Sequence, residues 1–142
     1  MQKDARLELE TVDGAGLRFR ATTDTNFSFL FDSGEGARGP SPVDGVLAAL
    51  GACAGMDVIS ILRKKRLAVT GYAIELHGVR RDEHPRAFTQ IETVHRVRGR
   101  GIDQAAVEEA VRLSETKYCS VHATLAPGVA LSSRIEIEEE GG

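Results

Sequence analysis

The chain has 142 residues, with 18 Lys and Arg against 21 Asp and Glu and a formal net charge of −3. This length predicts a single domain over residues 1–142 with its own hydrophobic core. The slightly negative balance excludes the basic surface on which nucleic-acid binding depends. Only two cysteines occur, Cys53 and Cys119, which are too few for a disulfide framework. They favour reduced thiols and a cytoplasmic protein, and the first residues lack the apolar core of a signal peptide.

The N-terminal part of the sequence alternates between apolar and polar residues, which predicts strands within residues 1–31. Asp13-Gly14 separates the first two runs and is typical of a hairpin turn. Alternate phenylalanines over residues 27–31 predict a third strand with one aromatic face. The next segment, residues 32–40, is too rich in glycine to be regular, so we expect a loop there. Such a loop is a candidate mobile cover over a functional site.

A helix start follows the loop. Ser41 can cap the helix, Pro42 suits its first turn, and Asp44 places a carboxylate at the positive end of the helix dipole. Residues 43–62 are apolar on nearly every face, as expected for a central helix that is packed on several sides. The same segment is long enough to cross a membrane, but it contains Asp44 and Asp57, and charges disfavour insertion. We therefore expect no membrane association.

The middle of the chain alternates again before a second helix begins. Two alternating runs are separated by His84-Pro85 and predict a pair of strands. Asp103 is predicted to cap an amphipathic helix that runs to Tyr118.

The C-terminal part returns to a strand-like pattern. Alternate apolar residues over 121–125 predict one strand, and those over 131–137 predict another. Residues 138–142 are expected to form a frayed tail. The order of strands, helix, strands, helix and strands is typical of an α+β fold, with residues 41–137 as its core.

The residues alone leave two interpretations of Cys53 open. It lies about three turns into the first predicted helix, where the helix dipole has little effect on the pKa of a thiol. A cysteine in an apolar helix is usually inert packing, and a reactive cysteine needs a nearby cation. The candidate cations are Arg18, Arg20, Arg38, Arg80 and Arg81, although each arginine taken singly is also typical of a solvated surface.

Metal binding is not favoured by the spacing of the possible ligands. Cys119 and His122 form a Cys-x-x-His pair, which with Cys53 would supply three ligands. Structural zinc sites usually gather four ligands in two close pairs, and the sequence offers no second pair. It also contains no phosphate loop or dinucleotide fingerprint. We therefore expect neither a metal nor a cofactor.

Two cysteine-containing segments resemble motifs of a known family. Residues 41–53 are similar to the first-cysteine motif of the OsmC/Ohr family, and residues 117–121 resemble its second-cysteine motif. Residues 57–62 and 85–89 are similar to the YhfA-like branch of that family. The likeness extends over about residues 40–125.

The resemblance implies an OsmC-like fold, in which antiparallel sheets surround two central helices and two chains form an entwined homodimer. It also implies thiol-dependent reduction of organic hydroperoxides in oxidative-stress defence. Carried over to this chain, Cys53 attacks the peroxide and becomes a sulfenic acid, and Cys119 condenses with it to a disulfide. A dithiol such as lipoamide or a lipoylated protein would then reduce the disulfide.

The sequence departs from the family pattern at one supporting position. Peroxide-reducing members place a glutamate ten residues before the first cysteine, where it holds an arginine near the thiolate. Val43 occupies that position here, so Asp44 is the candidate replacement and Arg18 the first candidate for the arginine. Two alternatives stay open: a small-ligand-binding dimer, and a redox-sensing dimer without peroxidase turnover.

Overall fold

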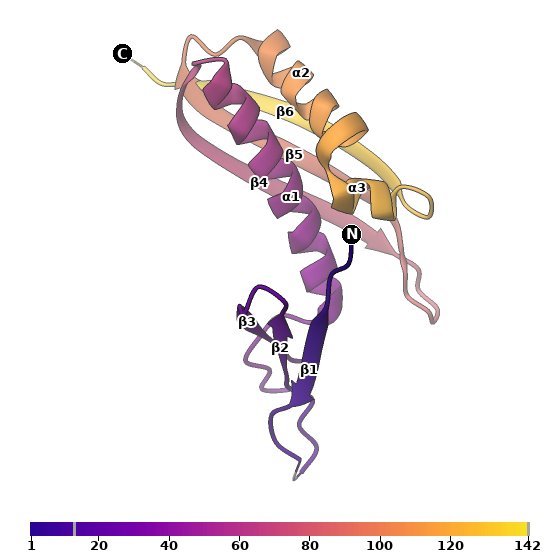
Figure 1. Ribbon diagram of the computed structural model, residues 1–142. Coiled ribbons are helices and arrows are strands. Elements are labelled where there is room, and N and C mark those ends of the chain that lie inside the picture. The colour runs from indigo at the N-terminus through magenta and orange to yellow at the C-terminus, as the bar shows by residue number, and fades with distance from the viewer. Residues whose placement is uncertain (13, 142) are drawn as a thin grey trace. The chain divides into compact units, whose positions relative to one another are not determined.

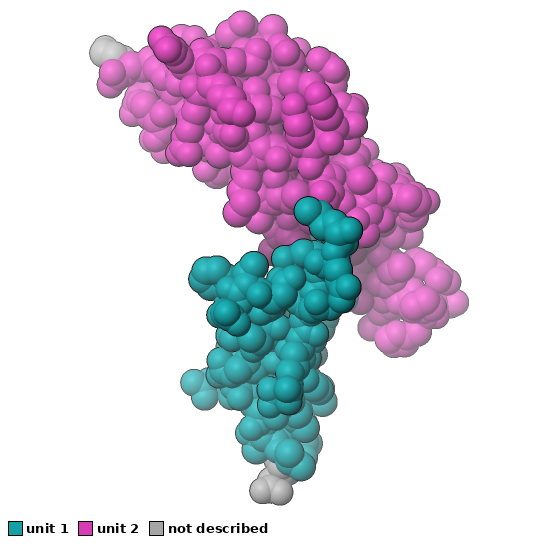
Figure 2. All heavy atoms as spheres, viewed as in Figure 1, with its two compact units in different colours: residues 1–46 teal, residues 47–142 magenta. Residues whose placement is uncertain are grey.

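A computed structural model describes residues 1–12 and 14–141 of the chain (Figure 1). The chain forms two compact units, Met1–Val46 and Leu47–Gly142, which are coloured separately in Figure 2. Helix α1, Pro42–Lys64, begins in the first unit and ends in the second. That the whole chain acts as one domain stays a prediction.

The N-terminal unit contains a three-stranded antiparallel sheet in the order β1-β2-β3. Its strands are Ala5–Leu9, Phe19–Thr23 and Ser28–Phe31, within the range that the alternation predicts. Asp13, the first residue of the predicted hairpin turn, lies outside the described residues. Gly14 has a φ of 83°, a left-handed conformation that glycine adopts without steric cost.

One buried carboxylate anchors the glycine-rich loop to the end of β3. Asp32 is only 6% exposed, and it accepts hydrogen bonds from the backbone N–H groups of Arg38 at 3.0 Å and Ser33 at 2.8 Å. Arg18 Nε donates a further bond to Asp32 Oδ2 at 3.1 Å. These contacts, with that of Arg38 the largest, hold the pKa of Asp32 below its ordinary value. Whether the loop covers a site stays a prediction.

Helix α1 starts at the predicted residue. Ser41 Oγ accepts a hydrogen bond from the backbone N–H of Asp44, and Asp44 Oδ2 accepts one from the backbone N–H of Ser41, each at 3.1 Å. This reciprocal pair is a capping box, which satisfies two backbone donors at the helix start. Arg63 and Lys64 lie in the last turn, where the negative end of the helix dipole favours cations.

The second unit contains a mixed sheet in the order β4-β5-β6, with strands Ala68–Arg80, Phe88–Arg100 and Ala130–Glu139. The α+β class is confirmed, and β4 and β5 pair antiparallel as expected. However, β5 and β6 pair in parallel, which corrects the prediction of antiparallel sheets throughout. The physical reason is the helical segment between these strands, since a crossover connection returns the chain in the same direction.

The C-terminal end of β6 is more ordered than predicted. The strand runs through Glu139, so residues 138 and 139 are not a frayed tail. The Glu139 carboxylate accepts a hydrogen bond from the backbone N–H of Gly101, and the backbone N–H of Glu140 donates to the carbonyl of Gly99. These contacts hold residues 139 and 140 against the C-terminal end of β5. Gly142 lies outside the described residues.

Three helical elements connect β5 to β6: α2 at Gln104–Leu113, the π-helical turn η1 at Ser114–Tyr118, and α3 at Ser120–Leu125. Asp103 caps α2 as predicted, because its side chain accepts a hydrogen bond from the backbone N–H of Ala105 at 3.1 Å. The predicted helix therefore begins where expected, but its last five residues, Ser114–Tyr118, are π-helical instead of α-helical.

The prediction of a strand over residues 121–125 is wrong, since these residues form α3. Val121 and Leu125 lie one helical turn apart, and both pack against the same apolar cluster. Three alternating apolar residues fit one face of a short helix as well as one face of a strand. The Cys119 side chain caps the start of this helix and so favours it over a strand, and alternation in the sequence does not reveal such a cap.

Helices α1 and α2 cover the same face of the β4-β5-β6 sheet (Figure 1). Buried residues from α1, β5 and α2 meet between the helices and the sheet: Val58, Leu62, Val97, Val107, Ala110 and Val111. His95 also lies in this buried layer, 1% exposed, with its Nδ1 2.6 Å from the hydroxyl of Tyr72. Burial lowers the pKa of His95 and raises that of Tyr72. Its burial and its contact with Tyr72 make His95 a structural core residue.

Helix α1 buries only part of its apolar surface within one chain. Only 22% of its most apolar stretch is buried, and Met56 is 71% exposed. The helix is long and apolar enough to cross a membrane by length and composition, a test that core helices of soluble proteins also pass. The prediction of packing on several sides is therefore not met inside a single chain.

A groove of about 800 Å³ runs between α1 and β4. Glycine lets the strand side chains approach the helix closely here. A Cβ on Gly51 would lie 2.6 Å from Leu76 Cδ1, and one on Gly55 would lie 2.6 Å from Ile74 Cδ1. The groove is lined mainly by apolar and small side chains, with Arg63 at its edge.

Candidate functional site

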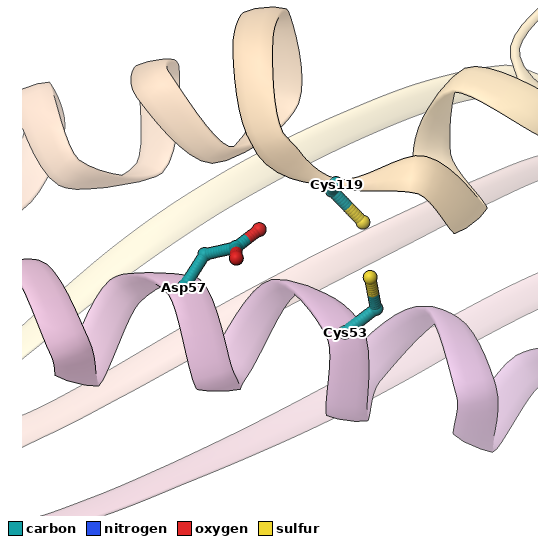
Figure 3. Close-up of side chains that lie close together, drawn as sticks. All are labelled: Cys53, Asp57 and Cys119. Atoms are coloured by element: carbon teal, nitrogen blue, oxygen red, sulfur yellow. The ribbon is translucent and has the colours of Figure 1, made fainter. Parts of the chain in front are cut away.

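The structure brings the two cysteines of the chain together in the second unit. The donor atoms of Cys53, Asp57 and Cys119 all lie within 4.8 Å of one another, and both cysteines are free thiols. Cys53 and Asp57 point from α1 towards Cys119, which lies between η1 and α3 (Figure 3). Cys53 and Asp57 share a face of α1, because residues four apart lie one turn from each other.

The π-helical turn places Cys119. Its backbone N–H donates to the carbonyl of Ser114 at 2.8 Å, a bond that spans five residues instead of four. Cys119 then leaves the helix with extended dihedrals (φ −76°, ψ 103°) and caps α3, since its Sγ accepts a hydrogen bond from the backbone N–H of His122 at 3.3 Å. Single π-turns of this kind are frequent at functional sites.

A side-chain hydrogen bond connects α1 to this turn. Ser114 Oγ, which belongs to a residue 1% exposed, donates to Asp57 Oδ2 at 2.9 Å. The bond fixes the orientation of the Asp57 carboxylate beside the two thiols. From the sequence, Asp57 is not a candidate site residue: it weighs against a membrane span and begins the family-like segment 57–62. Its position four residues after Cys53 was the signal that could have placed it in the site.

The surroundings of the thiols are apolar. Cys119 is 4% exposed, and together with Cys53 it packs into a cluster contributed by α1, α3 and the sheet. The other buried and half-buried members are Leu47, Leu50, Leu76, Phe88, Ile91, Val121, Leu125, Val129 and Leu131. Such a lining excludes water and favours apolar groups near the sulfurs.

The electrostatics of the site favour a protonated Cys119. Burial is the largest of the causes that together raise the pKa of the Cys119 thiol to about 11. The backbone N–H of His122 acts in the opposite direction, while Cys53 and the Asp57 carboxylate contribute to the rise. Among the described residues, no hydrogen bond or ion pair joins an arginine side chain to either sulfur.

The other predicted site residues have structural partners in the N-terminal unit. Arg18 pairs with Asp32 at 3.1 Å, and Arg20 Nη2 pairs with Glu10 Oε1 at 2.9 Å. Arg38 contributes its backbone N–H to Asp32, and Asp44 caps α1 through Ser41. Roles for Arg18 and Asp44 beside Cys53 stay predictions.

Comparison with known proteins identifies the fold and the family. A crystal structure of a hypothetical protein from Aquifex aeolicus VF5 has a TM-score of 0.85 and 32% sequence identity, with 99% of each chain covered. The crystal structure of the organic hydroperoxide resistance protein OhrB of Bacillus subtilis has a TM-score of 0.62 at 15% identity, covering 96% of this chain and 98% of OhrB. At that identity the likeness concerns the fold, and the fold is OsmC-like.

The sequence assigns the family. The family profile described as OsmC-like protein matches residues 34–134. Protein YhfA of Escherichia coli strain K12 is 40% identical over 122 residues, which cover 86% of this chain and 91% of YhfA. The chain therefore belongs to the OsmC family, as its two cysteine motifs indicate.

The raised pKa of Cys119 predicts a slow reaction of this thiol with iodoacetamide. Relative to an ordinary thiol pKa of 9.0, a pKa of about 11 lowers the thiolate fraction at pH 8 about 100-fold. Timed alkylation followed by peptide mass mapping should show Cys119 labelled far more slowly in the folded protein than in urea. Equal rates in the two states would contradict the burial of this thiol.

Proposed function

We propose that this protein is a thiol-dependent peroxidase that reduces organic hydroperoxides in the cytoplasm as part of oxidative-stress defence. The observation that carries the proposal is the approach of Cys53 Sγ and Cys119 Sγ to within 4.8 Å inside an apolar cluster. A pair of thiols at this separation can close a disulfide by side-chain rotation, since the S–S bond needs about 2.05 Å.

The proposed cycle balances with a hydroperoxide as oxidant and a dithiol as reductant. The Cys53 thiolate attacks the distal peroxide oxygen, the O–O bond breaks, and the alcohol leaves with a proton as Cys53 becomes a sulfenic acid. The Cys119 thiol then attacks the Cys53 sulfur, a disulfide forms, and water leaves. A dithiol such as lipoamide or a lipoylated protein returns both cysteines to thiols by exchange and is itself oxidised.

The division of roles between the cysteines follows from their burial. Cys53 is half-buried, whereas Cys119 is almost fully buried and has a raised pKa. The more accessible thiol meets the substrate, and the protonated, buried thiol suits the resolving step. The apolar lining favours alkyl hydroperoxides over hydrogen peroxide, and the similar fold of OhrB belongs to a protein named for organic hydroperoxide resistance.

A homodimer is part of this proposal. The exposed apolar face of α1 and the groove beside it are the surfaces that a second copy of the chain would cover. The small residues on that face let another backbone approach closely. The groove also supports a second candidate function, binding of a small apolar ligand, in which the cysteines serve only as packing.

Peroxide treatment separates these functions. Reduced protein exposed to tert-butyl hydroperoxide should lose both thiols to a Cys53–Cys119 disulfide, and dihydrolipoamide should sustain repeated turnover. Cys53→Ser should abolish the reaction, whereas Cys119→Ser should stop at a sulfenic acid that dimedone traps. Mass spectrometry of the thiols gives the readout.

The outcomes distinguish the three hypotheses. An unreacted Cys53 at millimolar peroxide would overturn the peroxidase and favour the ligand-binding dimer. Stoichiometric oxidation that dihydrolipoamide reverses without turnover would identify a redox sensor.

Arg18 is proposed to support the Cys53 thiolate, with Asp44 in the place of the family glutamate. If this is correct, Arg18→Gln should slow the oxidation of Cys53 about tenfold, the effect of losing about 1.4 kcal/mol of thiolate stabilisation. The matched control is Arg6→Gln, which removes an exposed arginine of β1 that is not a candidate for the site. Equal rates for both variants and the wild type would exclude a role for Arg18.

The proposed dimer predicts a charge-sensitive α1 face. Ala52 is exposed on α1, and Ala52→Glu should dissociate the dimer, because a carboxylate would be buried without a partner. The control is Ala105→Glu in the first turn of α2, where a carboxylate is favourable. Light scattering coupled to size exclusion should give twice the chain mass for the wild type and control, and the chain mass for Ala52→Glu. A monomeric wild type would contradict the dimer.

A further inference from the structure

The three donor atoms at the candidate site have the composition of a metal site. They are the sulfurs of Cys53 and Cys119 and a carboxylate oxygen of Asp57, all within 4.8 Å of one another. The sequence suggested Cys53, Cys119 and His122 as possible ligands. In the structure Asp57 of α1 takes the third place, because His122 contacts Cys119 through its backbone N–H. The geometry points to a Zn²⁺ site formed by Cys53, Asp57 and Cys119 in the reduced protein, contrary to the expectation of no metal.

The distances suit a tetrahedral ion. Zinc lies about 2.3 Å from thiolate sulfur and about 2.0–2.2 Å from carboxylate oxygen, so two donors on one ion lie roughly 3.6–3.8 Å apart. Donor atoms that already lie within 4.8 Å need to close by no more than about 1.2 Å, which small side-chain rotations provide. Three protein ligands leave the fourth position for water, as in open zinc sites.

The charges suit a divalent cation. Two thiolates beside a carboxylate, all within 4.8 Å, would repel one another. A bound cation reverses this balance, because it attracts all three anions and displaces the thiol protons. Thiolate ligands select Zn²⁺ over Mg²⁺ and Ca²⁺, which prefer oxygen donors.

A second contact orients the carboxylate ligand. Ser114 Oγ donates to Asp57 Oδ2, and it leaves the other carboxylate oxygen outside this bond. Hydrogen bonds of this kind fix ligand orientation, and their loss typically lowers metal affinity about 10–100-fold. The buried position of Ser114 keeps the donor in place.

Zinc binding and the Cys53–Cys119 disulfide would exclude each other. Zinc requires both thiolates, so a Cys53–Cys119 disulfide removes two of three ligands, and bound zinc in turn keeps both sulfurs from oxidation. Binding itself does not depend on the peroxidase proposal, because it needs only the reduced thiols and Asp57.

The test is a cobalt titration of the reduced, metal-free full chain, since Co²⁺ reports thiolate ligation by an intense ligand-to-metal band. We expect a band that saturates at one Co²⁺ per chain and disappears on addition of one equivalent of Zn²⁺. Cys53→Ser and Cys119→Ser should each weaken the thiolate band and the affinity for Zn²⁺, measured by competition with a chromophoric chelator.

Asp57→Asn is the discriminating variant, because asparagine still accepts the bond from Ser114 but carries no charge. It should lower the affinity for Zn²⁺ at least tenfold, and Ser114→Ala should lower it about 10–100-fold. The matched control is Asp82→Asn, which removes an exposed carboxylate of the same unit and should leave the affinity unchanged.

Three results would overturn the site: a cobalt spectrum without a thiolate band, wild-type affinity in Asp57→Asn, or equal Zn²⁺ binding by the disulfide form. If Asp57→Asn does not fold, as judged by circular dichroism, the test is the Zn²⁺ affinity of the wild type in its reduced form against that in its disulfide form. Peroxide reactivity is measured separately on metal-free protein, so failure of zinc binding and failure of the peroxidase are distinguishable.

Discussion

The hydrogen bond from Ser114 Oγ to Asp57 Oδ2 joins α1 to the π-helical turn, and the geometry of the site depends on it. The two residues lie 57 positions apart in the sequence. Cys53 lies one turn before Asp57 on α1, and Cys119 closes the backbone bond to Ser114. The contact that orients the carboxylate therefore joins the two segments that carry the sulfurs. Leaving one partner of such a buried bond unsatisfied costs about 1–3 kcal/mol.

A cation beside the two cysteines would favour thiolate chemistry at this site. Within the described residues of the second unit, the Asp57 carboxylate lies beside both sulfurs, and it disfavours the ionisation of Cys119. An arginine from the N-terminal strands would supply the positive charge in the proposed peroxidase. Zinc would supply it in the proposed metal-bound form. Both proposals answer the same electrostatic requirement, and each uses Cys53 and Cys119.

Much of the fold follows from local sequence signals, and the exceptions have local physical reasons. The capping box at Ser41 and Asp44 and the cap at Asp103 set two helix starts correctly. The parallel pairing of β5 and β6 depends on contacts distant in sequence, which alternation does not encode. The π-turn before Cys119 likewise has no periodic signal, so the sequence predicts a strand over residues 121–125, where the chain forms α3. Both cysteines were anticipated from their motifs, whereas Asp57 and Ser114 emerge only once the chain is folded.

The most direct test of this account is the disulfide equilibrium of the wild type in buffers of reduced and oxidised glutathione. If Cys53 and Cys119 face each other as described, the protein should form an intramolecular disulfide without retaining glutathione, because the second thiol displaces the mixed disulfide. Ser114→Ala should make that disulfide less stable. Accumulation of glutathione on Cys53 with Cys119 still free, read by intact-protein mass spectrometry, would contradict the central claim.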